Sequence, residues 1–131
     1  MNPLFGKYRG KVEDDIDPLG MGRLRVSVPA LSGDGHSSWA MPCVPYAGRD
    51  VGFYALPPIG ANVWVEFEGG DPDRPIWTGC FWGRDEMPAE AATPGTVLFK
   101  SEAITLTMGD APGTAVFRIE TSDGKKLVIE L

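Results

Sequence analysis

The sequence is poor in the residues that most metal sites and many catalytic sites require. It has one histidine, His36, and two cysteines, Cys43 and Cys80, among 131 residues. Two cysteines cannot build a disulfide-rich scaffold or a four-ligand zinc site, and a single histidine excludes any site that needs two. His36 lies in a Gly/Ser loop, whereas the members of a catalytic triad normally come from separate elements. We therefore predict no catalytic residue, no cofactor and no metal.

Long apolar runs and an excess of positive charge are also lacking. No run approaches the ~18 apolar residues of a membrane span, and the first seven residues do not have a basic start followed by an apolar stretch, so we expect no signal peptide. Twelve basic residues stand against eighteen acidic ones, which gives a net charge of −6. Because a nucleic-acid binder needs a surface that neutralises phosphate, we predict no nucleic-acid partner.

Turn-forming residues are abundant. Seventeen glycines and twelve prolines occur alongside 43% apolar and 23% charged residues, which is globular composition. Glycine and proline at this density nearly exclude long helices. The hydrophobic period is close to two, which indicates strands. The chain is therefore predicted to be all-β, with one domain or one domain plus an appendage.

Five strands are expected in the first two thirds of the chain. They cover residues 7–13, 23–28, 39–44, 62–68 and 76–82. Residues 69–75 form a short Gly/Pro/Asp connection, which predicts an antiparallel hairpin. The aromatic-rich segment 76–82 is predicted to be buried on both sides, and Pro42 places its strand at an edge or a bulge.

The connection over residues 45–60 is long and carries Phe53, Tyr54, Leu56 and Ile59. So many apolar side chains are not expected to be freely solvated, and we predict that this segment packs back over one mouth of the sheet. Five strands with a long third connection fit an oligonucleotide/oligosaccharide-binding (OB) barrel, which would occupy residues 5–84.

A second strand block follows a linker. Residues 85–96 contain two prolines and few large apolar residues, with room for one helical turn. Residues 97–131 form four short strands, which cannot enclose a core alone. Either the barrel or other copies of the chain must cover their apolar face, and we favour other copies. The side chains predicted to lie between copies are Val97, Phe99, Ile104, Leu106, Phe117, Ile119, Leu127, Ile129 and Leu131.

Three other groups of residues admit two interpretations each. The aspartates near Asp17 and Asp71 could serve catalysis or bind calcium, but Asp before Pro more often initiates a turn. Cys43 and Cys80 could form a disulfide bridge, but without a secretion signal we predict buried free thiols. The aromatic side chains could stack on single-stranded nucleic acid, but neighbouring acidic residues favour core packing or a protein interface. These aromatic residues are Phe53, Tyr54, Trp64, Trp77 and Trp82.

The order of motifs through the barrel resembles that of phage baseplate assembly protein V and VgrG-type spike proteins. The matching stretches are residues 6–12, 17–26, 39–42, 52–72 and 75–83. The resemblance implies an OB domain in the central spike of a contractile tail or injection system, assembled in the bacterial cytoplasm. It also implies a homotrimer that docks beneath a trimeric tail hub protein, with C-terminal strands wound into an intertwined spike. A PAAR-type tip protein and transient contact with a target membrane are further expectations.

We assign Phe53, Tyr54 and Leu56 to the hub contact. The chain has no lysozyme domain, no long repeat region and no His-x-His pair, so the resemblance implies neither cell-wall digestion, nor a long spike, nor an iron-bound tip. Two other classes remain open at this point: an OB module that binds nucleic acid or carbohydrate, and an enzyme that uses an unrecognised carboxylate pair.

Overall fold

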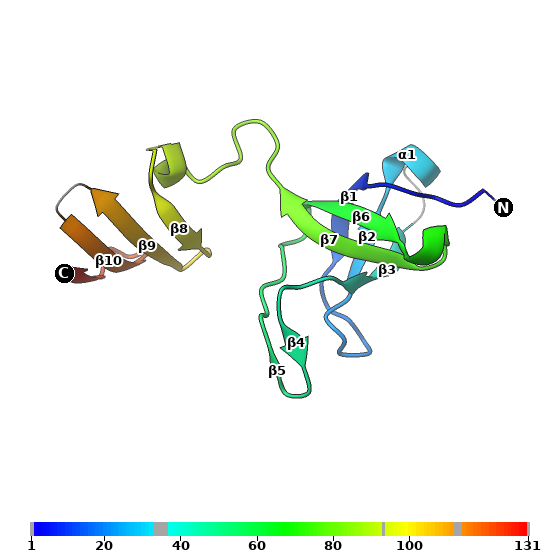
Figure 1. Cartoon of the computed structure of the whole chain (residues 1–131), viewed down its shortest axis with the longest axis horizontal. Coiled ribbons are helices and arrows are strands. Elements are labelled where there is room, and N and C mark those ends of the chain that lie inside the picture. The colour runs from blue at the N-terminus through cyan, green and yellow to red at the C-terminus, as the bar shows by residue number, and fades with distance from the viewer. Residues whose placement is uncertain (1, 33–36, 93, 112–113, 131) are drawn as a thin grey trace. The chain divides into compact units, whose positions relative to one another are not determined.

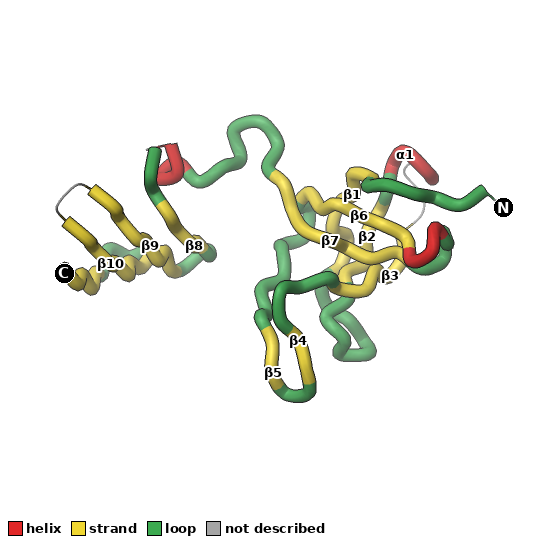
Figure 2. Tube along the Cα trace, viewed as in Figure 1, coloured by secondary structure: helices red, strands yellow, loops and turns green. Residues whose placement is uncertain are grey.

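The computed structural model describes residues 2–32, 37–92, 94–111 and 114–130. The chain divides into two compact units, Met1–Gly83 and Arg84–Leu131, and each is described by itself. Strands dominate both units (Figures 1 and 2). The helical segments among the described residues are short: α1 covers Pro29–Ser32, and 3₁₀ turns cover Glu68–Gly70 (η1) and Ala89–Ala92 (η2).

The first unit is a closed five-stranded barrel with the order β1-β2-β3-β7-β6. Its strands are β1 (Tyr8–Asp14), β2 (Leu24–Ser27), β3 (Ser37–Pro42), β6 (Asn62–Phe67) and β7 (Pro75–Phe81). The predicted hairpin of β6 and β7 is antiparallel, and β3 pairs with β7 in parallel to close the barrel. The predictions of an all-β chain and of a barrel consistent with an OB fold are confirmed.

Alternating side chains of these strands fill the barrel. The buried core consists of Val12, Leu24, Val26, Val28, Ala40, Val63, Val65 and Trp77. Gly10 lies on β1 among them, and a Cβ built there would lie 2.9 Å from a methyl of Val65 and 3.0 Å from the Ser27 carbonyl oxygen. The period-two pattern therefore reports correctly which side chains face inward.

Two burial predictions are wrong. Strand β7 is not buried on both sides, because Cys80 is exposed and Phe81 is half-buried on the outer surface. Cys43, just after β3, is also exposed. The aromatic residues of β7 lie on both sides of the strand: Trp77 is in the barrel core, and Phe81 contacts Trp64 on the outer surface, with ring centroids 4.5 Å apart.

The long connection forms a two-stranded arm instead of covering a barrel mouth. Its strands are β4 (Ala47–Gly48) and β5 (Val51–Gly52), which pair antiparallel and project from the barrel (Figure 1). The Phe53 amide donates a 2.8 Å hydrogen bond to the Tyr46 carbonyl and extends the pairing. Because the backbone pairs with itself, only the base of the segment, at Leu56, packs against the core.

The second unit is a four-stranded antiparallel sheet with the order β11-β10-β9-β8. Its strands are β8 (Val97–Lys100), β9 (Ile104–Ala111), β10 (Thr114–Thr121) and β11 (Lys126–Glu130). The expected turn between β10 and β11 has Gly124 at φ 95°, and the Thr121 amide donates to the Lys125 carbonyl at 2.9 Å. No described residue of this unit is buried, so the sheet is a single layer without its own core.

Candidate functional site

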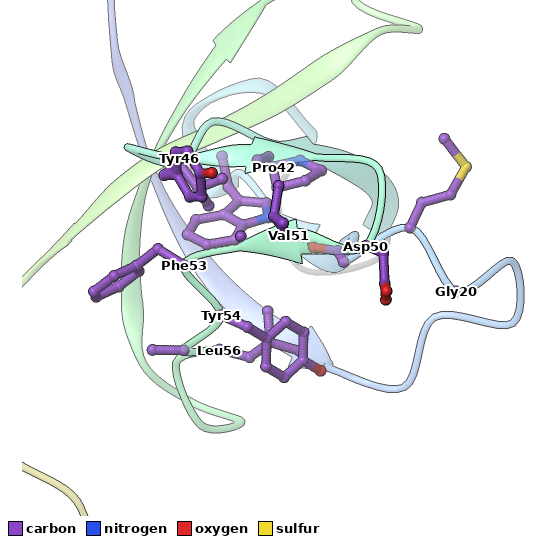
Figure 3. A pocket seen from close by; sticks show the side chains of 15 residues that line it. Gly20, Pro42, Tyr46, Asp50, Val51, Phe53, Tyr54 and Leu56 are labelled. Carbon is purple, nitrogen blue, oxygen red and sulfur yellow. Dashed lines mark hydrogen bonds between the residues drawn. The ribbon is translucent and has the colours of Figure 1, made fainter.

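An apolar cleft of about 410 Å³ lies between the arm and the barrel (Figure 3). One wall is the arm and the segment after it, the other is the loop that joins β1 to β2, and Trp77 contributes from the barrel. The lining residues are Gly20, Met21, Gly22, Pro42, Val44, Tyr46, Ala47, Asp50, Val51, Gly52, Phe53, Tyr54, Ala55, Leu56 and Trp77.

The β1–β2 wall is held by a clasp between Asp17 and Arg23. The Asp17 carboxylate accepts hydrogen bonds from the amides of Leu19, Met21 and Arg23 at 3.0, 2.9 and 3.2 Å. The Arg23 guanidinium donates to it from Nε at 3.1 Å and from Nη2 at 2.7 Å. The Asp17 side chain is only 4% exposed. The loop is therefore fixed by one carboxylate that satisfies three backbone donors and one cation.

The clasp is joined to the barrel at two points. Arg23 stacks over Trp39, with its guanidinium carbon 5.3 Å from the ring centroid. The Trp77 indole donates from Nε1 to the Gly22 carbonyl at 3.3 Å. Trp77 is buried in the core and also lines the cleft, so the β1–β2 wall is anchored to the barrel core.

The side chains around the cleft are unusually exposed for apolar residues. Tyr54 is 78% exposed, Tyr46 60%, Phe53 52% and Val51 51%. A two-stranded hairpin is marginal in water, and contiguous exposed apolar surface marks an interaction site. The lining includes a single carboxylate, that of Asp50 on the arm. This arrangement suits the docking of apolar side chains from another protein, because it offers an apolar surface and no set of reacting groups.

The structure brings together the three residues that the sequence assigned to a docking role. Phe53, Tyr54 and Leu56 all line the cleft (Figure 3), with Leu56 packed at its base. The opposite wall, at Met21 and Gly22, was not predicted from the sequence. The cluster of turn residues from Asp17 to Gly22 signalled a structured loop there, but not what the loop would face.

The second candidate surface is one face of the C-terminal sheet. Strand register aligns two rows of apolar side chains across it. The rows are Val97, Met108, Phe117 and Ile129, and then Phe99, Leu106, Ile119 and Leu127. All the predicted contact residues on described strands lie on this face, and Met108, which was not among the predicted residues, lies there too. Leu131, also predicted, lies outside the described residues.

The opposite face of the sheet is mixed. Its rows are Leu98, Thr107, Arg118 and Val128, and then Lys100, Thr105, Glu120 and Lys126. Exposure on the apolar face is high: Phe99 is 52% exposed and Leu127 56%. The described residues of this sheet therefore lack the second layer that usually packs on the apolar face of a sheet.

The aspartates considered above as catalytic or calcium-binding candidates form turns. Asp14 accepts from the Ile16 amide at 2.9 Å, and Asp71 accepts from the Asp73 amide at 2.9 Å, as expected for aspartates that initiate turns. His36 lies outside the described residues.

Within the described part of the chain, no group of three or more His, Cys, Asp or Glu side chains is placed to hold a metal ion. None of the helices found there is long and apolar enough to cross a membrane.

A model of a known protein family matches the barrel. The sequence model described as "Type VI secretion system/phage-baseplate injector OB domain" matches residues 8–82. These residues run from the first residue of β1 to just beyond β7, so the match covers all five barrel strands and the arm.

Several curated proteins are similar to part of this chain. The type VI secretion system spike protein VgrG1c of Pseudomonas aeruginosa is 39% identical over 70 residues, which are 50% of this chain and 10% of the relative. The actin cross-linking toxin VgrG1 of Vibrio cholerae is 40% identical over 90 residues, 66% of this chain and 8% of the relative. The spike protein VgrG3 of V. cholerae is 33% identical over 81 residues, 59% of this chain and 8% of the relative. The chain thus spans about a tenth of the length of the relatives it matches.

Proposed function

The chain belongs to the type VI secretion system/phage-baseplate injector OB domain family, and from this we propose that it is a non-enzymatic, structural component of the central spike of a contractile tail or injection system. In this proposal three copies assemble around one axis. The barrel, residues 5–84, joins the hub, and residues 97–131 of the three copies form the spike, with residues 85–96 as linker.

The observation that carries the proposal is the single-layer C-terminal sheet. Eight apolar side chains in two rows lie on one face, and no described residue of that unit is buried. Burying one such side chain fully contributes about 1.5–3 kcal/mol. Three copies that turn this face toward a common axis would bury all the rows at once, since symmetry repeats each contact without new sequence.

The hub contact is proposed for the apolar cleft of the barrel. Phe53 and Tyr54 supply exposed aromatic surface, and the Asp17–Arg23 clasp holds the facing wall in place. Aromatic side chains in a preformed cleft are typical anchors of protein interfaces. We expect Tyr54→Ala to reduce co-purification with the trimeric hub protein of the same injection system, whereas Ile59→Ala, 64% exposed and outside the cleft lining, should not.

The remaining partners and the location follow from the same proposal. The component would assemble in the bacterial cytoplasm as part of a virion tail or an injection-system baseplate. A PAAR-type tip protein would cap the distal end of the spike, and contact with a target membrane would be transient. The net charge of −6 counts against the nucleic-acid-binding alternative.

The decisive experiment is the mass of the full chain in solution. Size-exclusion chromatography with light scattering at micromolar concentration should give the mass of three chains. A stable monomer under these conditions would overturn the proposed assembly. Because the barrel has its own buried core, far-ultraviolet circular dichroism of the same sample would show whether a monomer is folded.

A further inference from the structure

The outer surface of β1, β6 and β7 carries a basic row beside an aromatic pair. Along β1, Arg9 and Lys11 are exposed while Gly10 and Val12 face the core, and Lys7 precedes the strand. Three basic residues of the barrel therefore lie in a row along β1, although the net charge of the whole chain is negative. The residues of this surface neither line the cleft nor belong to the C-terminal sheet.

Arg9 lies over the aromatic pair formed by Trp64 and Phe81. Its guanidinium carbon lies 5.3 Å from the Trp64 ring centroid and 5.1 Å from that of Phe81. The pairing register places Arg9 opposite Trp64, and Trp64 opposite Gly79. A guanidinium stacked on rings is pre-organised, and its planar N–H edge matches a carboxylate.

Gly79 leaves a gap beside this stack. It lies at the irregularity between Trp64 and Val65, has φ +146°, and a Cβ built there would have no atom within 4 Å. Glycine at such a position in a strand marks a place where another backbone can approach closely. The gap therefore allows a partner segment to reach Arg9 from the side of β7.

The positive charge of the row is only partly compensated. Lys7 donates to Glu66 at 2.6 Å and to Thr78 at 3.3 Å. The salt bridges found among the described residues pair neither Arg9 nor Lys11 with a carboxylate. Arg9 and Lys11 thus remain available to an acidic partner.

The barrel also presents a surface of the opposite sign, at the turn between β6 and β7. Asp71 and Asp73 are exposed there, next to Glu68. The turn is rigid, because the Asp71 amide donates to the Glu68 carbonyl and the Arg74 amide to the Asp71 carbonyl, each at 3.0 Å. Arg74 pairs closely with Glu68, at 2.6 Å, and only at 4.0 Å with Asp71.

We propose that the acidic turn of one copy, at Asp71 and Asp73, docks on the Arg9–Lys11 surface of the next copy. This inference rests on the proposed trimer and names a contact between neighbouring barrels within it. Two different complementary patches on one chain make a head-to-tail interface, which a three-fold axis closes into a ring. Such exposed ion pairs are individually weak and screened by salt, so the contact orients the barrels and does not drive assembly.

The test is zero-length carbodiimide cross-linking of the full chain. Unlabelled and ¹⁵N-labelled chains are mixed in equal amounts, unfolded and refolded together so that mixed trimers form, and cross-linked at low salt. Mass spectrometry should then find mixed-isotope peptides that join Lys7 or Lys11 to Asp71 or Asp73. Arg9→Glu should reduce their yield at least about tenfold, since it places a like charge against the turn, while Arg25→Glu, an exposed arginine on β2, should leave the yield unchanged. Arg9→Glu combined with Asp73→Arg should restore it.

Three outcomes would overturn the contact, and they are distinguishable. A three-chain mass without these inter-chain peptides, or with a yield that Arg9→Glu does not change, would refute the contact and leave the trimer standing. A one-chain mass would refute the trimer and the contact together. Binding of a 20-nucleotide single-stranded DNA that Arg9→Glu abolishes and Arg25→Glu does not would make the surface a nucleic-acid platform instead.

Discussion

Arg23 reaches across the β1–β2 loop to Asp17 and donates from both Nε and Nη2 to its carboxylate, at 3.1 and 2.7 Å. This hydrogen bond from Arg23, aided by the amides of Leu19, Met21 and Arg23, lowers the pKa of Asp17 far below its ordinary value. These hydrogen bonds fix the β1–β2 loop, so that it forms a stable wall of the cleft.

The stability of the barrel should depend on Asp17 at acid pH. Because the pKa of Asp17 is lower in the folded state, its contribution is complete above the unfolded value, about 3.9, and is lost as pH falls below it. Asp17→Asn should lower Tm at pH 7 and flatten the loss of Tm between about pH 4 and pH 2. Asp15→Asn, in the same loop, is the control. Identical acid profiles for wild type and Asp17→Asn would contradict the clasp.

Leu24 anchors the barrel core. Its side chain is 0% exposed, so Leu24→Ala should lower the free energy of unfolding by about 2–5 kcal/mol through lost burial and the cavity left behind. Leu19→Ala, at a site 66% exposed, should change it by less than about 0.5 kcal/mol. Urea unfolding followed by tryptophan fluorescence measures both, and equal effects would show that the inward-facing set is misassigned.

Neighbouring residues of β9 separate the two faces of the C-terminal sheet. Leu106 lies in the apolar row between Phe99 and Ile119, whereas Thr107 lies on the mixed face beside Arg118. Leu106→Asp should abolish self-association, because it would bury an unpaired charge between copies. Thr107→Asp should leave the mass by light scattering unchanged. Equal loss in both variants would indicate that the strand has been disrupted instead of an interface.

Close packing around Gly10 admits no side chain. An alanine Cβ would meet Val65 at 2.9 Å and the Ser27 carbonyl oxygen at 3.0 Å. Gly10→Ala should therefore cost about 1–3 kcal/mol, as overpacked sites do. Gly109→Ala, also in a strand, has its nearest neighbour at 4.0 Å and should be tolerated. Thermal unfolding of both variants gives the comparison, and an unchanged Tm in Gly10→Ala would mean that β1 and β6 can separate locally.

The sequence predicted the barrel strands well because their periodicity comes from one buried face. Around Val26 and around Val65, the alternation of apolar and polar residues within a single strand is enough to identify the side chains that face the core. The same pattern in β8 to β11 identified most of the apolar face, but it missed Met108. That side chain joins the rows only through the register of β9 with β8 and β10.

Other features depended on contacts that no local pattern records. Strands β4 and β5 have two residues each, too few to show any alternation, so the arm was taken for a segment that packs over the barrel. The parallel pairing of β3 with β7 joins segments far apart in the chain. Asp17 looked like one turn aspartate among several, because its partner Arg23 becomes apparent only when the loop closes.

The bare apolar face of the C-terminal sheet has a consequence for the newly made polypeptide. A copy released from the ribosome carries Phe99, Ile104, Leu127 and Ile129 into solution with each about half exposed. Exposed apolar surfaces of this kind promote aggregation before partner chains cover them. Slow expression, which keeps the concentration of uncovered chains low at any moment, should therefore raise the soluble yield, and rapid overexpression should give inclusion bodies or a product that chaperones retain.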